Sequence, residues 1–246
     1  MPIPTLFVTA TDTEVGKTAV AAALAALLRR RGRNVGVMKP LASGCDTVDG
    51  ALVAADAVCL ARAAGVDDAH ELVCPIRLRP PLAPTVAAER DHAVVDLTAV
   101  WAARDRLAAV HDCLIVEGIG GIMVPLTADR TVLDVAAEFG APVLVVARAG
   151  LGTINHSLLT VDALRQRGLT VAAVLLNTAT NAPHETGGAA VETNPSAIAR
   201  ATGLPVLGPL PWCEGVSVAS AELGPLPDAL AGLDGVEELL SRHLGA

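Results

Sequence analysis

The sequence has few aromatic residues and no tyrosine. Aromatic side chains make up 2% of the 246 residues, whereas 52% of the residues are hydrophobic. A folded core must therefore be built from alanine, valine, leucine and isoleucine. Because single-stranded nucleic acids bind by stacking their bases on aromatic rings, this scarcity argues against such a partner. The formal net charge of −8 argues against nucleic acid in general and against an anionic membrane surface.

The five cysteines are odd in number and form no C-x-x-C pair. Both features disfavour a framework of disulfides and a zinc site. We expect each thiol to be a small buried residue in a reducing compartment.

Long hydrophobic runs are also lacking. The longest, residues 19–28, has ten residues, whereas a helix that spans a bilayer needs about 20. Asp12 and Glu14 precede this run, in place of the basic residues that begin a secretory signal. We therefore expect a cytoplasmic protein without a membrane partner.

Strand-like and helix-like segments alternate along the whole chain. Near-continuous apolar strands are typical of a parallel sheet that is covered on both faces. No linker, repeat or low-complexity block divides the sequence, so we expect residues 1–246 to form one doubly wound α/β domain with a mostly parallel sheet. The predicted strands are 3–9, 34–39, 112–118, 141–147, 170–177 and 204–212, and the predicted helices are 17–31, 51–64, 98–111, 153–168, 194–203 and 227–244, with a proline-rich stretch at 75–89.

The segment T-A-T-D-T-E-V-G-K-T, residues 9–18, joins the first predicted strand to the first predicted helix. It ends in Gly16, Lys17 and Thr18 like a phosphate-binding loop, although Thr11 stands where G-x-x-x-x-G-K-[ST] has its first glycine. The unpaired N–H groups at a helix N-terminus can hold phosphates, a lysine can reach the β- and γ-phosphates, and a threonine can bind Mg²⁺. The alternative is an ordinary strand-to-helix turn in which a threonine caps the helix. The position of this segment between a strand and a helix favours the phosphate loop. We therefore expect a fold of the P-loop NTPase type that binds ATP together with Mg²⁺.

Two further charged residues follow predicted strands. Glu117 comes after the apolar run C-L-I-V, where an acidic residue can hold the Mg²⁺ of a bound nucleotide. Lys39 ends the second predicted strand and would point into the crevice where such folds bind ligands. Alone, the first would be interpreted as a solvated cap and the second as a surface lysine. Beside a phosphate loop, they indicate a ligand site.

Five segments occur in an order and at spacings that resemble dethiobiotin synthetase, the penultimate enzyme of biotin synthesis. They are T-D-T-E-V-G-K-T (11–18), K-P-L-A-S-G (39–44), V-E-G-I-G-G (116–121), G-L-G-T-I-N-H (150–156) and L-P-W (210–212). The first two are specific, and the third is shared with related amidoligase ATPases. In that family the first glycine of the loop lies one residue earlier than usual. Ala10 stands there in this sequence, and we expect it to keep a negative φ, the condition under which alanine can replace glycine.

The resemblance implies a cyclo-ligase reaction in which 7,8-diaminononanoate, CO₂ and ATP give dethiobiotin, ADP and phosphate. One amine captures CO₂ as a carbamate, ATP phosphorylates the carbamate to a mixed carbamic-phosphoric anhydride, and the second amine closes a cyclic urea. Such catalysis is mostly positioning and charge neutralisation. The resemblance also implies a homodimer, in which the other subunit contributes a helix N-terminus that binds the substrate carboxylate.

The resemblance assigns roles residue by residue. Lys17 and Lys39 would be catalytic and neutralise the γ-phosphate and the carbamate, and Thr18, Asp56 and Glu117 would be the Mg²⁺ ligands. The implied ATP-binding residues are Glu14, Val15, Gly16, Lys17, Thr18, Ala19, Asp56, Glu117, Gly118, Ile119, Gly120, Asn177, Thr178, Gly208, Pro209 and Leu210. Asn177 would read the adenine, aided by the loop G-P-L-P-W (208–212). The implied substrate-binding residues are Ser43, Pro84, Gly150, Leu151, Gly152, Thr153 and Asn155. Thr85 stands where the family often carries a histidine, which leaves the contacts near 84–86 open, and 180–193, with His184, is expected to be a surface loop.

A partition- or division-type ATPase with the same fold is the main alternative. Such switches carry an additional lysine early in the loop, which acts across the dimer, and Asp12, Thr13 and Glu14 occupy the corresponding positions here. The acidic segment 228–244 is also unlike a basic membrane-binding helix. A cobyrinate-type amidase would need a fused glutaminase domain, and a bare nucleotide-binding module would give no role to Lys39 and Ser43. We therefore expect the synthetase.

Overall fold

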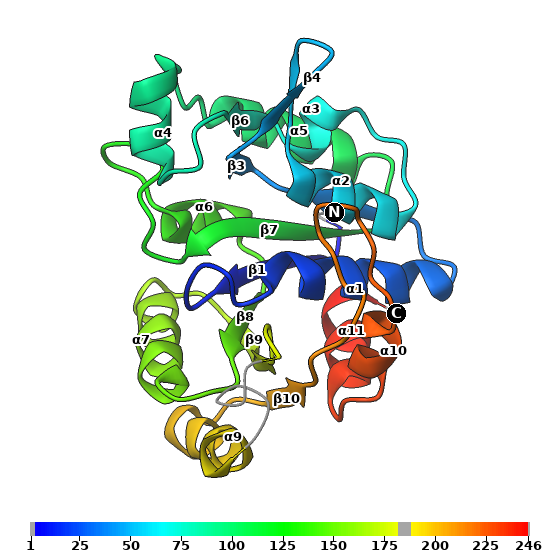
Figure 1. Cartoon of the computed structure of the whole chain (residues 1–246), viewed down its shortest axis with the longest axis vertical. Coiled ribbons are helices and arrows are strands. Elements are labelled where there is room, and N and C mark those ends of the chain that lie inside the picture. The colour runs from blue at the N-terminus through cyan, green and yellow to red at the C-terminus, as the bar shows by residue number, and fades with distance from the viewer. Residues whose placement is uncertain (1–2, 182–187, 246) are drawn as a thin grey trace.

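The structure, a computed structural model, describes residues 3–181 and 188–245. Its centre is a six-stranded sheet in which every pair of neighbouring strands is parallel (Figure 1). The order is β10–β9–β8–β1–β7–β2. The strands are β1 (Thr5–Ala10), β2 (Val35–Met38), β7 (Cys113–Gly121), β8 (Val143–Arg148), β9 (Val171–Asn177) and β10 (Val206–Leu210). The predicted doubly wound α/β fold is confirmed.

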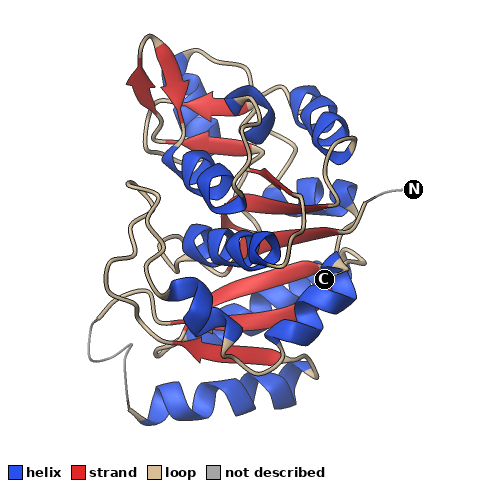
Figure 2. Ribbon diagram, turned by 90° about the vertical axis from the view of Figure 1, so that its right-hand side faces the viewer, coloured by secondary structure: helices blue, strands red, loops and turns tan. Residues whose placement is uncertain are grey.

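Helices cover both faces of this sheet (Figure 2). Along β1, Leu6 and Val8 point to one face and Phe7 to the other, and all three are fully buried. Successive side chains of a strand alternate between faces, so a strand covered on both sides must be apolar throughout. The first face packs against α1 (Lys17–Arg30), α2 (Ala55–Ala64), α10 (Leu226–Ala231) and α11 (Val236–Leu244), and the second against α5 (Thr98–Ala108), α6 (Val132–Phe139), α7 (Thr153–Gln166) and α9 (Ala189–Thr202). α4 (Pro84–Asp91) packs instead against a small separate sheet.

Two small sheets follow β2, in a region where the sequence analysis placed loops and the start of a helix. The pairs are β3 (Leu41–Ser43) with β6 (Ile76–Leu78), which are parallel, and β4 (Asp46–Val48) with β5 (Ala51–Val53), which are antiparallel. The predicted helix over 51–64 is therefore wrong at its start. Asp49 and Gly50 join β4 to β5 with φ values of 50° and 80°, and an Asp-Gly pair with positive φ at both residues is a favoured hairpin turn.

Several helices also differ from the predictions. The short α3 (His70–Val73), and α4 in the proline-rich stretch, were not predicted. α9 begins at Ala189 rather than at 194, and Pro195 lies inside it. Asn-Pro resembles a helix start, because asparagine caps helices and proline favours their first turn. The predicted helix 227–244 is divided into α10 and α11 by a turn that ends at Gly235, where φ is 83°. The short α6 was not predicted, although Thr131 and Asp134 form a reciprocal capping box at its start.

The membrane and cysteine expectations can be compared with the described part of the chain. Within residues 3–181 and 188–245, no helix is both long and apolar enough to cross a bilayer. All five thiols are free, and Cys45, Cys59, Cys74 and Cys113 are buried, as predicted, whereas Cys213 is half-buried. Burial raises the pKa of Cys74 to about 12. Residues 182–187 of the predicted 180–193 loop, including His184, lie outside the described residues, and the loop prediction is wrong for 189–193, which belong to α9.

The start of α2 is anchored by a histidine of α3 (His70–Val73). The backbone N–H of Ala54, the residue before α2, donates to Nε2 of His70 at 3.1 Å. This nitrogen can accept a hydrogen bond only while it carries no proton. Burial, aided by the nearby Arg77 cation, lowers the pKa of His70 below its ordinary value of 6.5.

The lowered pKa predicts a pH dependence of stability. At pH values between the folded pKa of His70 and 6.5, the unfolded chain binds more protons than the folded chain. The contribution of neutral His70 to the free energy of unfolding is therefore complete above pH 6.5 and is lost as the pH falls. His70→Gln keeps a side-chain acceptor that does not titrate. Urea unfolding from about pH 7.5 to 5 should show a smaller loss of stability for this variant than for the wild type. His156→Gln, on the exposed side of α7, is the control, and superimposable profiles for His70→Gln and the wild type would contradict the interpretation.

Candidate active site

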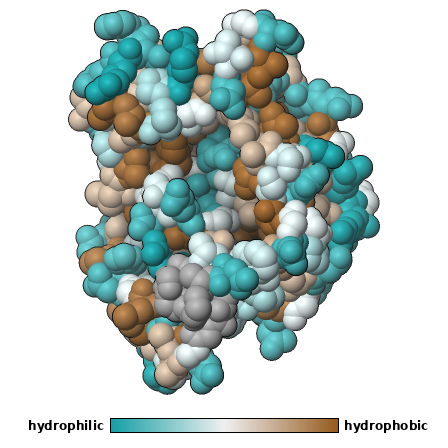
Figure 3. All heavy atoms as spheres, viewed as in Figure 1, coloured by the Kyte–Doolittle hydropathy of each residue, from teal (hydrophilic) through white to brown (hydrophobic). Residues whose placement is uncertain are grey.

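The loops that follow the central strands line a cavity of about 520 Å³. All strands of the central sheet are parallel, so their carboxyl ends, and the loops that leave them, meet at one edge. The space-filling view shows the molecule hollowed near the middle of one face (Figure 3). The predicted site residues that line the cavity are Glu14, Gly16, Lys17, Thr18, Ala19, Lys39, Ser43, Asp56, Ile119, Gly120, Asn177 and Thr178.

The phosphate-loop segment has the backbone that such a loop requires. Glu14 and Gly16 have positive φ values of 58° and 82°, and such left-handed residues let successive N–H groups converge on an anion. The side-chain Nδ2 of Asn177 donates to the carbonyl of Val15 at 2.9 Å and holds the loop from β9. A Cβ on residue 16 would lie 2.2 Å from that nitrogen, so a glycine is needed there. Ala10 is the last residue of β1 and has no positive φ, as expected.

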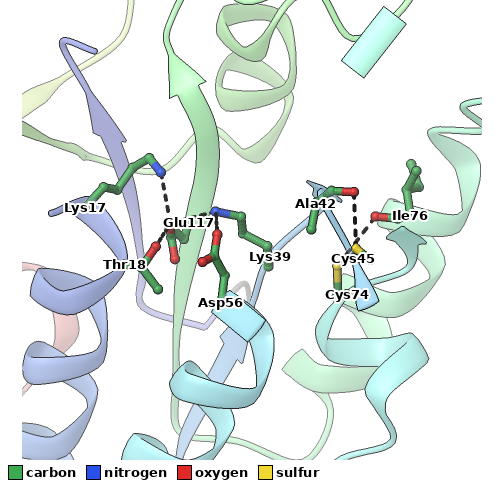
Figure 4. Close-up of polar contacts among 9 residues, drawn as sticks. All are labelled: Lys17, Thr18, Lys39, Ala42, Cys45, Asp56, Cys74, Ile76 and Glu117. Carbon is green, nitrogen blue, oxygen red and sulfur yellow. Dashed lines mark hydrogen bonds and ion pairs between the residues drawn. The ribbon is translucent and has the colours of Figure 1, made fainter. Parts of the chain in front are cut away.

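Glu117 lies at the centre of the polar contacts in this site (Figure 4). Its Oε1 accepts from Lys17 Nζ at 2.9 Å, from Lys39 Nζ at 2.7 Å and from the Thr18 hydroxyl at 2.8 Å. Lys39 Nζ also lies 2.7 Å from Asp56 Oδ2. The first turn of α1, the residue after β2, the middle of β7 and the first turn of α2 therefore meet at one cluster. Lys17 and Lys39 are the only lysines in the sequence.

Burial makes this cluster electrostatically important. Glu117 is fully buried and Lys39 is 1% exposed, and a buried charge is costly unless it is paired and hydrogen-bonded. Two ammonium groups and two carboxylates give the cluster a formal charge of zero. The structure thereby confirms that Lys39 points into the crevice at the carboxyl ends of the strands, and it excludes a surface position for this lysine.

The pKa values of the cluster reflect both burial and pairing. Burial alone would lower the pKa of Lys39, but the carboxylates of Glu117 and Asp56 raise it well above its ordinary value, so Lys39 is a fixed cation. Burial would raise the pKa of Asp56, but the ammonium of Lys39 holds it below its ordinary value. Burial lowers the pKa of Lys17, and the contact with Glu117 does not fully offset this effect.

The oxygen atoms beside the two lysines fit a magnesium ion. Mg²⁺ binds oxygen ligands and takes one or two carboxylates in addition to phosphate oxygens. Within the described part of the chain, the buried Oε2 of Glu117 has no hydrogen-bond partner. The Asp56 side chain is 35% exposed and lines the cavity, as does Thr18. A buried carboxylate oxygen without a donor, next to a second carboxylate and a hydroxyl, is a suitable donor set for this cation.

Several predicted nucleotide-binding residues lie elsewhere. Gly208, Pro209 and Leu210 belong to β10, and Leu210 pairs with Asn177 in the sheet. The chain leaves the sheet only at residue 211. The cavity wall begins there, with Pro211, Trp212, Cys213, Gly215, Val216, Val218 and Leu226. Pro211 and Trp212 belong to the loop 208–212 that the resemblance placed at the adenine, whereas the sequence analysis did not assign the residues from Cys213 onward to the site.

The wall formed by residues 211–226 is fastened to α2. In Figure 1 this segment crosses α1 toward α2 and returns to α10. Ser217 and Glu222 exchange backbone hydrogen bonds of 2.8 Å, which close a small hairpin. Arg62 of α2 donates to the carbonyl of Ser220 at 3.0 Å. The apolar wall and the helix that carries Asp56 are therefore connected.

The remaining predicted residues do not line the cavity of the described chain. Val15, Glu117 and Gly118 are buried behind its surface. Pro84 is the buried first residue of α4. The segment 150–155 forms the turn after β8 and the start of α7, where Leu151 is 83% exposed.

Comparisons with known proteins agree in placing the chain among ATP-dependent enzymes. Residues 4–220 match the family described as AAA domain. The ATP-dependent dethiobiotin synthetase BioD of Anaeromyxobacter dehalogenans (strain 2CP-C) is 45% identical over 219 residues, which cover 89% of this chain and 95% of that protein. The protein of the same name from Bacillus cereus (strain G9842) is 43% identical over 211 residues, 85% of this chain and 84% of that protein. The one from Thermodesulfovibrio yellowstonii is 37% identical over 213 residues, 84% of this chain and 88% of that protein.

Proposed function

The chain belongs to the ATP-dependent dethiobiotin synthetase family, and on that premise we propose that it closes the urea ring of dethiobiotin from 7,8-diaminononanoate, CO₂ and ATP. ADP and phosphate are the other products. Members of this family are ligases that form carbon–nitrogen bonds. One observation carries the proposal for this chain: both lysines of the sequence meet Glu117 beside the phosphate loop.

The reaction consists of three bond-forming steps. One amine nitrogen attacks the carbon of CO₂ and loses a proton, which gives a carbamate. A carbamate oxygen attacks the γ-phosphorus of ATP and ADP leaves, which gives a carbamic-phosphoric anhydride. The second amine attacks the carbamoyl carbon, loses a proton and expels phosphate. None of these steps needs a covalent bond to the protein, so the chain contributes position and charge.

Each part of the site suits one part of this chemistry. The N-terminus of α1 and Lys17 would hold the β- and γ-phosphates, and Asn177, Thr178 and the wall from Pro211 would surround the base. Mg²⁺ held by Thr18, Asp56 and Glu117 would neutralise phosphate oxygens. Lys17 and Lys39 converge on one carboxylate oxygen, so both ammonium groups face the place where negative charge develops during phosphoryl transfer.

The substrate would lie between two copies of the chain. Ser43 lines the cavity next to Lys39 and would contact the diamine end. Gly150, Leu151, Gly152, Thr153 and Asn155 would bind the carboxylate of a substrate held by the neighbouring subunit. Leu151, in the turn before α7, and Leu159, on α7, are 83% and 63% exposed, and neighbouring exposed apolar residues are typical of an interface. We therefore infer a homodimer. We also propose that the enzyme works in the cytoplasm.

The direct test of this function is ATP cleavage coupled to the diamine. With MgATP and bicarbonate, ADP should appear only when 7,8-diaminononanoate is added, and dethiobiotin should form in equal amount. ADP release and product mass can be followed in the same reaction. ATP turnover that does not respond to the diamine would contradict the proposal and favour a regulatory ATPase.

Lys39→Met removes the fixed cation and keeps most of the length of the side chain. Loss of one preorganised charge at a transition state typically lowers kcat by about 10² to 10³-fold, and we expect a fall of this size with a modest weakening of ATP binding. Because Lys39 lies between two carboxylates, the variant should also lose about 3 kcal/mol of stability or somewhat more.

Activity of Lys39→Met is therefore measured at a temperature at which circular dichroism shows a native fold. Lys39→Arg is the matched control that keeps the charge, and it should retain more of the rate and of the stability. A fall in kcat of less than about threefold for Lys39→Met, equivalent to under ~1 kcal/mol of transition-state stabilisation, would exclude a catalytic role.

Subunit mixing tests the shared site. Lys17→Met inactivates the phosphate loop, and Gly152→Val strains the turn before α7, where φ is 89°. Each variant alone should be inactive. After random exchange half of the dimers are mixed, and each has one intact site, so about one quarter of the wild-type activity should return. No recovery in samples shown by mass spectrometry to have exchanged subunits would count against a site made by two chains.

A further inference from the structure

A buried asparagine of α9 holds the turn that leads into α7. Asn194 is 4% exposed. Its side-chain Nδ2 donates to the carbonyl oxygen of Ala149 at 2.8 Å and to that of Gly150 at 3.1 Å. The sequence pattern Asn-Pro suggested a helix cap at this position, but α9 starts five residues earlier, at Ala189, and the amide is used for a contact across the fold.

The same turn is held from the sheet. The backbone N–H of Ala149 donates to the carbonyl of Asn177 at 3.0 Å. Ala149 is thus bonded on one side to β9 and on the other to α9. Gly152 follows with a φ of 89°, and α7 begins at Thr153. The path of the chain from β8 into α7 is therefore set by a few hydrogen bonds.

The two carbonyl bonds determine where the neighbouring N–H groups point. In a trans peptide the C=O of one residue and the N–H of the next point in opposite directions. Asn194 draws the carbonyls of residues 149 and 150 toward α9 and the interior. The N–H groups of Gly150 and Leu151 must then point away from α9. Leu151 is 83% exposed, so these donors lie on the open side of the turn, next to the unpaired N–H groups that begin α7.

We propose that Asn194 is a positioning residue for the substrate carboxylate, because it fixes the turn whose outward N–H groups receive that anion. This inference rests on the function proposed above, which places the carboxylate at residues 150–155. Asn194 itself does not touch the substrate. Without its two donors, the buried carbonyls lack partners and the turn can rotate, which misdirects the N–H groups.

The test compares two diamines that differ only in the carboxylate. 7,8-Diaminononanoate carries it, and 2,3-diaminooctane has the same vicinal amines without it. Asn194→Asp keeps the shape of the side chain and removes both donors. For this variant we expect KM for diaminononanoate to rise about tenfold, the size of one lost hydrogen bond. KM for ATP, KM for 2,3-diaminooctane and kcat should stay near the wild-type values.

Two other variants complete the test. Asn194→Ser retains one short donor, should give a smaller rise in KM, and serves if the aspartate variant does not fold. Ser196→Ala removes an exposed hydroxyl of the same helix that bonds to Thr193 and Arg200, both within α9, and it should change none of these constants. A merely structural role of Asn194 would alter the constants for both diamines together.

The outcomes separate this inference from the proposed function. If the wild type uses both diamines with equal KM, the carboxylate site at 150–155 is wrong. If the wild type discriminates between them and the folded Asn194 variants discriminate equally well, the carboxylate site stands and the role of Asn194 is contradicted. If the wild type has a lower KM for diaminononanoate than for 2,3-diaminooctane and the Asn194 variants lose this difference, Asn194 positions the carboxylate site.

Discussion

One carboxylate oxygen of Glu117 accepts hydrogen bonds from Lys17, Lys39 and Thr18, and the arrangement of the site depends on this shared acceptor. The strand order explains how three distant segments reach it. β7 lies between β1 and β2, so Glu117, in the middle of β7, stands between the start of α1 that follows β1 and the residue after β2. A different strand order would separate the two lysines. The buried charges balance only when all members are present, which ties the stability of this edge of the sheet to its chemistry.

A second set of contacts connects the nucleotide loop to the turn before α7. Asn177 donates from its side chain to Val15 and accepts at its backbone from Ala149. Arg148 reaches back to Asp12 of the phosphate loop at 3.2 Å. In the proposed dimer these two segments serve different active sites, since the turn of one subunit faces the substrate held by the other. Contacts at the ends of β8 and β9 thus hold the phosphate loop and the turn before α7 in fixed positions relative to each other.

Much of this architecture could be predicted from the sequence, because apolar strands and a glycine-lysine-threonine turn are local signals. Lys39 and Glu117 could be placed because parallel strands end at one edge. Contacts between distant segments left no such signal. Nothing local shows that the segment after Trp212 lines the cavity, or that Asn194 bonds to a turn 45 residues away. The Asp-Gly hairpin after β4 and the capping box of α6 were local signals that the apolar pattern of neighbouring segments obscured.

The central claim, that one carboxylate holds both lysines, can be tested by NMR. With two lysines in the chain, labelling with ¹⁵N-lysine gives two side-chain ammonium signals, which Lys39→Met assigns. Replacing Glu117 by glutamine keeps the shape and removes the charge, and the account predicts that both signals shift. Asp56→Asn, which removes an ion pair with Lys39 that Lys17 does not share, should move mainly that signal. A Glu117→Gln spectrum in which one or both ammonium signals keep their wild-type positions would contradict the shared acceptor.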